Sequence, residues 1–190
     1  MKRQVRVLGV DDSPFTFQSK KTLVVGVVAR LPMYVEGIMQ TECEVDGTDA
    51  NDKISDMVLR SRYREQVRLI MFDGIAVGGF NVLDISRIRE LTGIPCATVT
   101  RELPDFKSME DALRKNFPDW RERMDLITRH PLYKVGTKRH PIYAAVTGMD
   151  IDIVDTIIQE STVQGSLPEP LRVAHLISSA MVRGESYGRA

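Results

Sequence analysis

Hydrophobic and polar positions in the first quarter of the chain follow the patterns of β-strands. Residues 5–10 form a β-rich run that ends at Asp11-Asp12-Ser13-Pro14, where the proline and the aspartates stop the strand. Residues 22–29 and 35–45 are two further β-rich runs, and hydrophobic and polar side chains alternate in the second. Because the connections are short, we expect these three strands to form an antiparallel meander.

From residue 49 onwards, helical and strand patterns alternate. Residues 67–72 are almost wholly apolar, which is typical of a strand buried on both faces, and the run ends at Asp73-Gly74. Residues 94–100 predict a fifth strand, and residues 142–146 are a candidate for a further short one. A turn at Gly78-Gly79 is expected to open a helix near Asn81. The other helices are expected at 52–62, from residue 108 to about 117, at 120–127, around 153–158 and at 168–181.

This order of elements predicts one α/β domain over residues 1–183, followed by a flexible tail at 184–190. The expected sheet is mixed and five-stranded, with the three-strand meander, two parallel strands and flanking helices. A ribonuclease H-like fold requires this order. The 190 residues, of which 43% are hydrophobic, are enough for one sizeable core.

Composition limits the cell compartment and the partners that are expected for the protein. No run approaches the roughly 20 apolar residues of a membrane span, so we expect a cytoplasmic protein that has no membrane partner. Cys43 and Cys96 stand alone and are interpreted as small buried residues in a reducing compartment. Lys plus Arg equals Asp plus Glu at 26 each, so nucleic-acid binding must use local basic patches.

Three carboxylates stand where separate elements end. Asp11 and Asp73 each follow a strand, and Asp49 lies where the third strand meets its helix. We expect them to converge at one edge of the sheet and to bind Mg²⁺ or Mn²⁺, which prefer hard oxygen ligands. Turn formation or helix capping is the alternative for each one alone. Asp12 and Asp46 are neighbours that can take the same role.

The last predicted helix adds a histidine to this set. His175 follows Arg172 by about one helical turn, so the two side chains share a helical face. A core position is the alternative for His175. If the face points towards the carboxylates, His175 is a candidate metal ligand or proton-transfer group, and Arg172 a partner for a carboxylate or a phosphate.

Taken together, these segments resemble a known group of nucleases. Gly9-Val10-Asp11, the buried strand that ends in Asp73-Gly74, and residues 168–175 (PEPLRVAH) resemble the endonuclease V superfamily. The segments 46–50 (DGTDA) and 73–81 (DGIAVGGFN) are more similar to the archaeal endonuclease dU family. The resemblance covers nearly the whole chain in the same order.

The resemblance implies a ribonuclease H-like fold and metal-dependent hydrolysis of a phosphodiester beside a deaminated base such as uracil or inosine, with DNA favoured over RNA. It implies that Asp11 and Asp73 are the core aspartates and that His175 is the histidine of the last helix. Asp49 takes the place of a glutamate after the third strand, and Arg101 that of a lysine after the fifth.

The chain departs from endonuclease V where that enzyme reads the lesion. It has Gly78-Gly79-Phe80-Asn81 instead of a Gly-then-His-Pro-Arg segment, and it lacks the Pro-Tyr-Ile-Pro-like wedge. Gly78 and Gly79 are interpreted as residues that permit a tight turn and a close backbone approach, and Asn81 as a candidate substrate contact. Two alternatives stay open: a nucleic-acid-binding protein without catalysis, and a receiver-like phosphoacceptor domain, which should place a helix directly after Asp11-Asp12.

Overall fold

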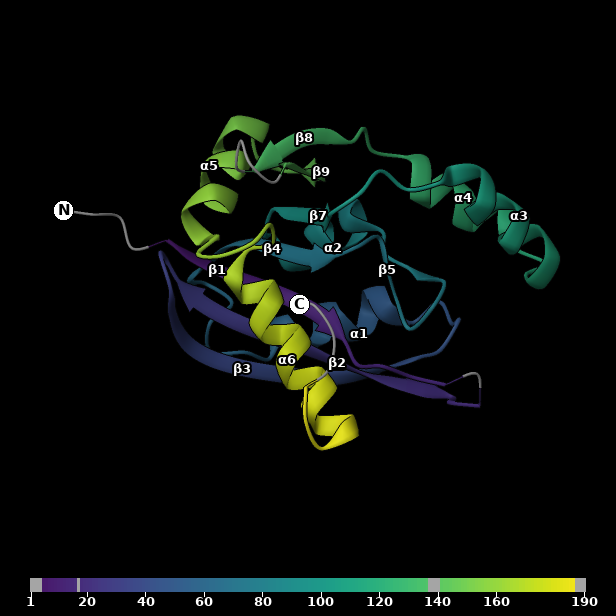
Figure 1. Cartoon of the computed structure of the whole chain (residues 1–190), viewed down its shortest axis with the longest axis horizontal. Helices are drawn as coiled ribbons and strands as arrows, with labels where there is room; N and C mark the ends of the chain where they lie inside the picture. The colour runs from purple at the N-terminus through teal and green to yellow at the C-terminus, as the bar shows by residue number, and fades with distance from the viewer. Residues whose placement is uncertain (1–4, 17, 137–140, 187–190) are drawn as a thin grey trace.

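The architecture is a seven-stranded mixed sheet with helices on both faces (Figure 1). The computed structural model describes residues 5–16, 18–136 and 141–186. The strand order across the sheet is β3-β2-β1-β4-β7-β9-β8. The strands are β1 (Arg6–Asp12), β2 (Lys21–Arg30), β3 (Tyr34–Glu44), β4 (Val67–Asp73), β7 (Cys96–Thr100), β8 (Tyr133–Gly136) and β9 (Pro141–Thr147), with β5 (Ala76–Val77) and β6 (Asn81–Val82) in a separate two-stranded sheet.

The pairing confirms the predicted meander and the two parallel strands. β1 pairs with β2 and β2 with β3 in antiparallel fashion, whereas β4 runs parallel to both β1 and β7. A receiver-like topology is therefore wrong, because β2 rather than a helix follows Asp11-Asp12. The helices are α1 (Ala50–Leu59), α2 (Ile85–Thr92), α3 (Phe106–Asn116), α4 (Trp120–Thr128), α5 (Ile151–Ser161) and α6 (Glu169–Arg183).

Strand periodicity divides the apolar side chains between two cores. Successive side chains of a strand point to opposite faces. Leu69 and Met71 of β4 thus pack in the core beneath α5 and the start of α6, and Ile70 and Phe72 pack in the core beneath α1 and α2. Both faces of β4 are covered, as its almost wholly apolar run predicted. The arm formed by α3 and α4 packs through a smaller cluster around Leu113 and extends to one side (Figure 1).

The sheet differs from the prediction in its number of strands. We expected five strands, but β9 pairs antiparallel with β7, and β8 pairs with β9 to form the far edge. The segment of β8 reads as a turn-rich basic stretch because only Val135 of its four residues is buried. The short strand expected at 142–146 is confirmed within β9.

The helix boundaries also differ from the prediction in places. The helix expected from Asn81 begins at Ile85, because Asp84 caps it by accepting a hydrogen bond from the Arg87 amide, and Asn81 belongs to β6. Helices α1 and α3 both begin two residues before their expected starts. α6 ends at Arg183, and residues 187–190 of the expected flexible tail lie outside the described residues. No helix of the described ranges is long and apolar enough to cross a membrane.

Candidate active site at the ends of β1 and β4

Two aspartates stand level on neighbouring parallel strands. The β1–β4 register pairs Val10 with Phe72, so the next residues along the two strands are Asp11 and Asp73. Paired strands lie about 4.8 Å apart, and residues two apart on a strand share a face. Asp11 is therefore on the face of Val7, and Asp73 is on the face of Met71, which is the face covered by α5 and α6. The register thus brings these two carboxylates together, as predicted.

Helix α6 adds His175 to the two carboxylates. The His175 ring donates from Nδ1 to Asp11 Oδ2 over 2.9 Å, since a carboxylate only accepts. The helix can approach this closely because Gly9 has no side chain: a Cβ there would lie 2.4 Å from the backbone carbon of Pro170. Ser178, one turn after His175, donates to the Asp12 carbonyl at 3.0 Å. Sequence reasoning missed Ser178, and its spacing from His175 was the only available signal.

Burial and like charge dominate the electrostatics of the site. Burial, and next the negative charge of Asp11, raise the pKa of Asp73 from 3.8 to about 6, while the positive charges of Arg101 and His175 act against this shift. The hydrogen bond to Asp11 raises the pKa of His175 above 6.5. Asp11 itself is only 6% exposed. Crowded carboxylates of this kind are stabilised by a bound cation.

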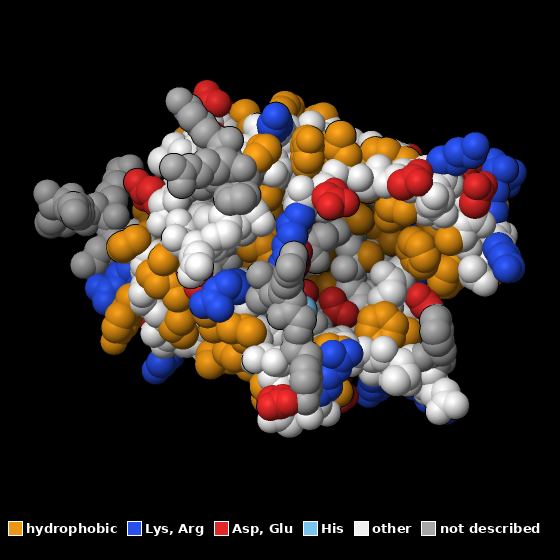
Figure 2. Space-filling view, viewed as in Figure 1, with side chains coloured by type: hydrophobic (Ala, Val, Ile, Leu, Met, Phe, Trp, Pro, Cys, Tyr) orange, Lys and Arg blue, Asp and Glu red, His pale blue; other side chains and the backbone are white. Residues whose placement is uncertain are grey.

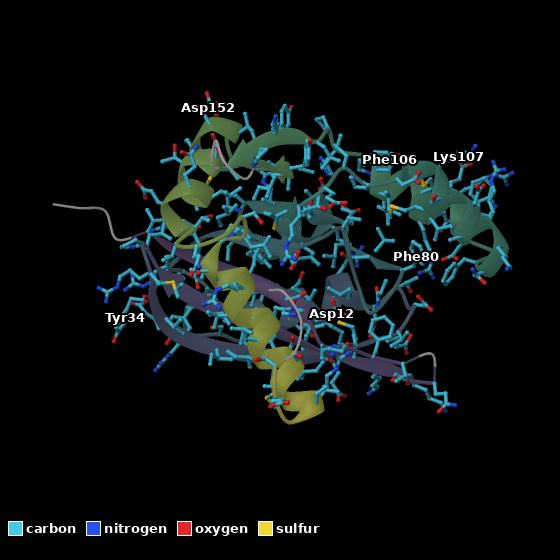
Figure 3. All side chains as sticks on the ribbon, in the orientation of Figure 1. Asp12, Tyr34, Phe80, Phe106, Lys107 and Asp152 are labelled. Atoms are coloured by element: carbon cyan, nitrogen blue, oxygen red, sulfur yellow. The ribbon has the colours of Figure 1, made fainter. Side chains whose placement is uncertain are left out.

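Asp12 occupies the opposite face of β1 from Asp11. The Asp12 side chain is labelled in Figure 3. Its Oδ2 accepts a hydrogen bond from the Gly78 amide at 2.9 Å, and burial raises its pKa to about 7. Gly78 and Gly79 both have a positive φ, of 54° and 81°. A Cβ on Gly78 would lie 2.8 Å from Thr22 of β2, and one on Gly79 would lie 2.3 Å from Asp46. The close backbone approach expected of the glycine pair is therefore made to the protein itself.

Asp49, Asp46 and Asn81 form a network apart from Asp11 and Asp73. Asp49 Oδ1 accepts from the Glu44 amide at 3.0 Å and from Asn81 Nδ2 at 2.8 Å, and Asp46 Oδ1 accepts from the Phe80 amide. Asn81 is fully buried, so it has no surface for the expected substrate contact. Of the three carboxylates that were expected to converge, only Asp11 and Asp73 do so. The hydrogen bonds of Asp49 instead join the β3–α1 loop to β6.

This network predicts a structural effect for Asn81. Its side chain also donates to the Glu44 carbonyl and accepts from the Ala50 amide, so Asn81→Ala leaves several buried groups unpaired. We expect the free energy of unfolding to fall by about 2 kcal/mol. Urea unfolding of Asn116→Ala, which loses one exposed hydrogen bond to Ala112, is the matched control. Equal stability of the two variants would contradict the structural assignment.

The two arginines named from the sequence lie in different places. Arg101, directly after β7, is close enough for its positive charge to lower the pKa of both Asp73 and His175. Arg172 instead donates to the buried Glu169 through Nε and Nη2, at 2.8 and 2.6 Å. Arg172 therefore stabilises the start of α6, and Arg101 is the arginine that lies near the candidate site.

The donor set fits a hydrated hard cation. Among the described residues, no three His, Cys, Asp or Glu side chains are grouped as ligands of one ion, so a closed protein cage is absent there. Mg²⁺ and Mn²⁺ do not need one, since one or two carboxylates, several waters and substrate phosphate oxygens complete their shells. Asp11 and Asp73, two crowded carboxylates at the ends of adjacent strands, would supply that protein share.

The fold is similar to that of solved endonuclease V structures. The catalytic domain of human endonuclease V superposes with a TM-score of 0.60 over 96% of this chain and 84% of its own, at 18% identity. Endonuclease V of Ciona intestinalis, solved with a DNA that contains an inosine, superposes with a TM-score of 0.63 over 97% and 88%, at 13% identity. Identities this low establish the likeness of fold alone.

Closer relatives are archaeal. An Archaeoglobus fulgidus protein of unknown function has a crystal structure with a TM-score of 0.85 and 36% identity, covering 95% of this chain and all of its own. The UPF0215 protein of Methanothermobacter thermautotrophicus is 41% identical over all of this chain and 94% of its own length. The model of the endonuclease dU family matches residues 3–182. The chain therefore belongs to the endonuclease dU family.

Proposed function

We propose that the protein is a Mg²⁺- or Mn²⁺-dependent endonuclease that hydrolyses a phosphodiester in nucleic acid, beside a deaminated base such as uracil or inosine. The observation that carries the proposal is the placement of Asp11 and Asp73 on adjacent strands, with His175 hydrogen-bonded to Asp11. The strand order β3-β2-β1-β4-β7 supports a ribonuclease H-like core, to which β9 and β8 are added.

Each side chain then has a separate task in hydrolysis. Asp11 and Asp73 would hold the ion, which when bound supplies Lewis-acid stabilisation of the phosphate and a nucleophilic water at neutral pH. His175 has its Nδ1 occupied by Asp11, which fixes the ring. When the ring is protonated, Nε2 carries the proton that would pass to the leaving oxygen. The positive charge of Arg101 attracts the substrate phosphate towards the two aspartates and His175.

The nucleic-acid partner is proposed from the family and from the structural neighbours. The Ciona intestinalis endonuclease V was solved with a DNA that contains an inosine followed by a ribo-adenosine, which supports a nucleic acid with a deaminated base as the partner of this chain. The preference for DNA over RNA is proposed from the family resemblance alone. The neutral overall charge, with 26 basic and 26 acidic residues, means that affinity must arise locally, near Arg101.

One assay tests activity, metal dependence and substrate together. Otherwise identical oligonucleotides with a single uracil, inosine or abasic site are incubated with Mg²⁺, Mn²⁺ or a chelator. We expect incision of a lesion-bearing strand in either metal, loss of incision in chelator, and recovery when the metal is restored. Incision that is insensitive to chelator would refute the metal site. Binding without incision under every condition would favour the alternative of a non-catalytic nucleic-acid-binding protein.

A further inference from the structure

The outer edge of β3 carries backbone groups that no other described strand uses. β3 is the first strand in the order across the sheet, and it pairs only with β2 (Figure 1). Natural edge strands are usually protected from further pairing by lysine, by proline or by a covering segment. Residues 34–44 contain no lysine and no proline, so any protection must come from other parts of the chain.

Such protection is present at the two ends of the strand. At the carboxyl end, the Glu44 amide donates to Asp49 Oδ1 over 3.0 Å, and its carbonyl accepts from Asn81 Nδ2 over 2.9 Å. Near the amino end, the Tyr63 hydroxyl donates to the Glu36 carbonyl. All three partners lie outside the sheet, so these backbone groups of Glu44 and Glu36 face away from β2.

Between these ends, three residues have outward backbone groups that stay open. The amide and carbonyl of one residue in an antiparallel strand point to the same side, and the side alternates from residue to residue. Counting back from Glu44, the backbone groups of Glu42, Gln40 and Ile38 therefore face outwards. No residue that the structure describes makes a hydrogen bond to them. They offer donors and acceptors at the spacing that an added strand requires.

A basic groove runs beside this open edge, on the face of the sheet that carries α1. The groove has a volume of about 660 Å³, and residues 37–41 of β3 form one wall. The opposite wall comes from α1 and the segment after it, and it includes Lys53, Arg60 and Arg62. Asp56 is the one carboxylate among the described residues that line the groove, and it pairs with Arg60 at 3.1 Å. The excess of positive charge favours an acidic ligand.

The other face of the open edge is apolar. Ile38 is 57% exposed and shares a face with its β2 partner Val27, which packs in the cluster beneath α6. Figure 2 shows hydrophobic side chains gathered beside α6 on this face, over the start of β3. An added strand places successive side chains alternately on this face and on the face of the groove. An alternation of apolar and acidic residues therefore fits the edge.

We propose that the outer edge of β3, at residues 38–42, binds an extended acidic segment of a partner protein as an added strand. The backbone of the segment pairs with the open groups of β3, and its acidic side chains lie beside Lys53 and Arg60. Asp11 and Asp73 lie on the opposite face of the sheet from the groove. The partner can therefore stay bound while the candidate active site is occupied.

Nucleic acid and a second copy of the chain fit this edge less well. The phosphates of a nucleic-acid strand only accept hydrogen bonds, so they leave the outward carbonyls of β3 unpaired. In an antiparallel pair of two β3 strands, Glu42 of each copy stays on the face of Ile38, because residues an even number apart share a face. The neutral side chains of Met39 and Thr41 would then meet the cations of the groove.

Peptide binding tests the surface. A short fluorescent peptide that alternates glutamate and valine is titrated into the wild-type protein, and a peptide that alternates lysine and valine is the matched control. We expect only the glutamate peptide to bind, with an affinity that falls as salt is added. The amide NMR signals of Ile38, Gln40 and Glu42 should shift on binding. Absence of binding by the glutamate peptide, or equal binding of the two peptides, would overturn the proposal.

Two variants separate the backbone pairing from the charge. Gln40→Pro removes an outward amide and leaves the pairing with β2, so the peptide should bind about tenfold more weakly or not at all. Lys53→Glu combined with Arg60→Glu reverses the charge of two exposed groove residues, and we again expect a loss of about tenfold. Lys107→Glu combined with Lys115→Glu, on exposed residues of α3, is the matched control. Wild-type affinity in both the proline and the groove variants would contradict the assignment.

Two other results would assign the edge to a different partner and overturn the acidic segment. One is a wild-type dimer in light scattering that becomes a monomer in Gln40→Pro, which identifies a second copy. The other is a single-stranded oligonucleotide that shifts the amide signals of Ile38 and Glu42 and displaces the peptide. Incision is not a readout in these experiments, so their outcome is independent of the proposed nuclease activity.

Discussion

Asp73→Asn and Asp11→Asn are each expected to reduce lesion-dependent incision by about a thousandfold or more while the protein stays folded. An amide keeps the shape of the carboxylate but not the charge that holds a divalent ion. Folding should not suffer from Asp73→Asn, because burial and the charge of Asp11 already disfavour the ionised form of Asp73. Single-turnover rates in saturating Mg²⁺, with thermal unfolding monitored in parallel, measure both effects.

The matched control for these variants is Asp56→Asn. Asp56 is an exposed aspartate of α1 whose carboxylate pairs with Arg60, so its substitution removes the same charge far from the site. Incision at the wild-type rate is expected for this control. If Asp11→Asn and Asp73→Asn also cut at the wild-type rate, these two residues are not the ion-binding pair.

Gly9→Ala is expected to lower both stability and activity, although Gly9 touches no substrate. The new Cβ would lie 2.4 Å from the backbone carbon of Pro170 and 2.6 Å from the Leu171 nitrogen, and backbone cannot rotate away. We expect a loss of roughly 3 kcal/mol in the free energy of unfolding. Displacement of α6 also moves His175 relative to Asp11, and a misplacement of about 1 Å costs on the order of a hundredfold in rate.

Gly37→Ala separates this effect from the general cost of replacing a glycine in a strand. Its Cβ would meet the ring of Tyr63, a side chain that can shift, rather than backbone. Chemical denaturation and incision rates of the two variants are compared, and we expect the smaller loss of stability and near-normal incision for Gly37→Ala. A Gly9→Ala protein with wild-type stability and rate would show that α6 docks without the close contact at Gly9.

Local sequence was sufficient for the five central strands and for the placement of two aspartates at strand ends. The apolar run before Asp73 and the β-rich run before Asp11 mark buried strands. The register seen in the structure then makes their terminal residues neighbours. The motif that contains His175 was also readable, since the residues that precede it on the last helix resemble a known family. These features depend on side chains close together in the sequence, where periodicity and turn chemistry act.

Other features were decided only by contacts between distant segments. Asp49 was a reasonable third carboxylate by position, but Asn81, 32 residues further on, draws its side chain into a structural network. β8 was not expected, because it is mostly exposed and pairs only with β9 at the edge of the sheet. The strand within β9 was expected at 142–146, but not as a member of the main sheet.

The sequence by itself thus determined which central strands form and which aspartates end two of them, because hydrophobic periodicity and chain breaks are local. The tertiary structure alone decided which polar side chains are free for chemistry, because a hydrogen-bond partner or a cavity wall can come from any part of the chain.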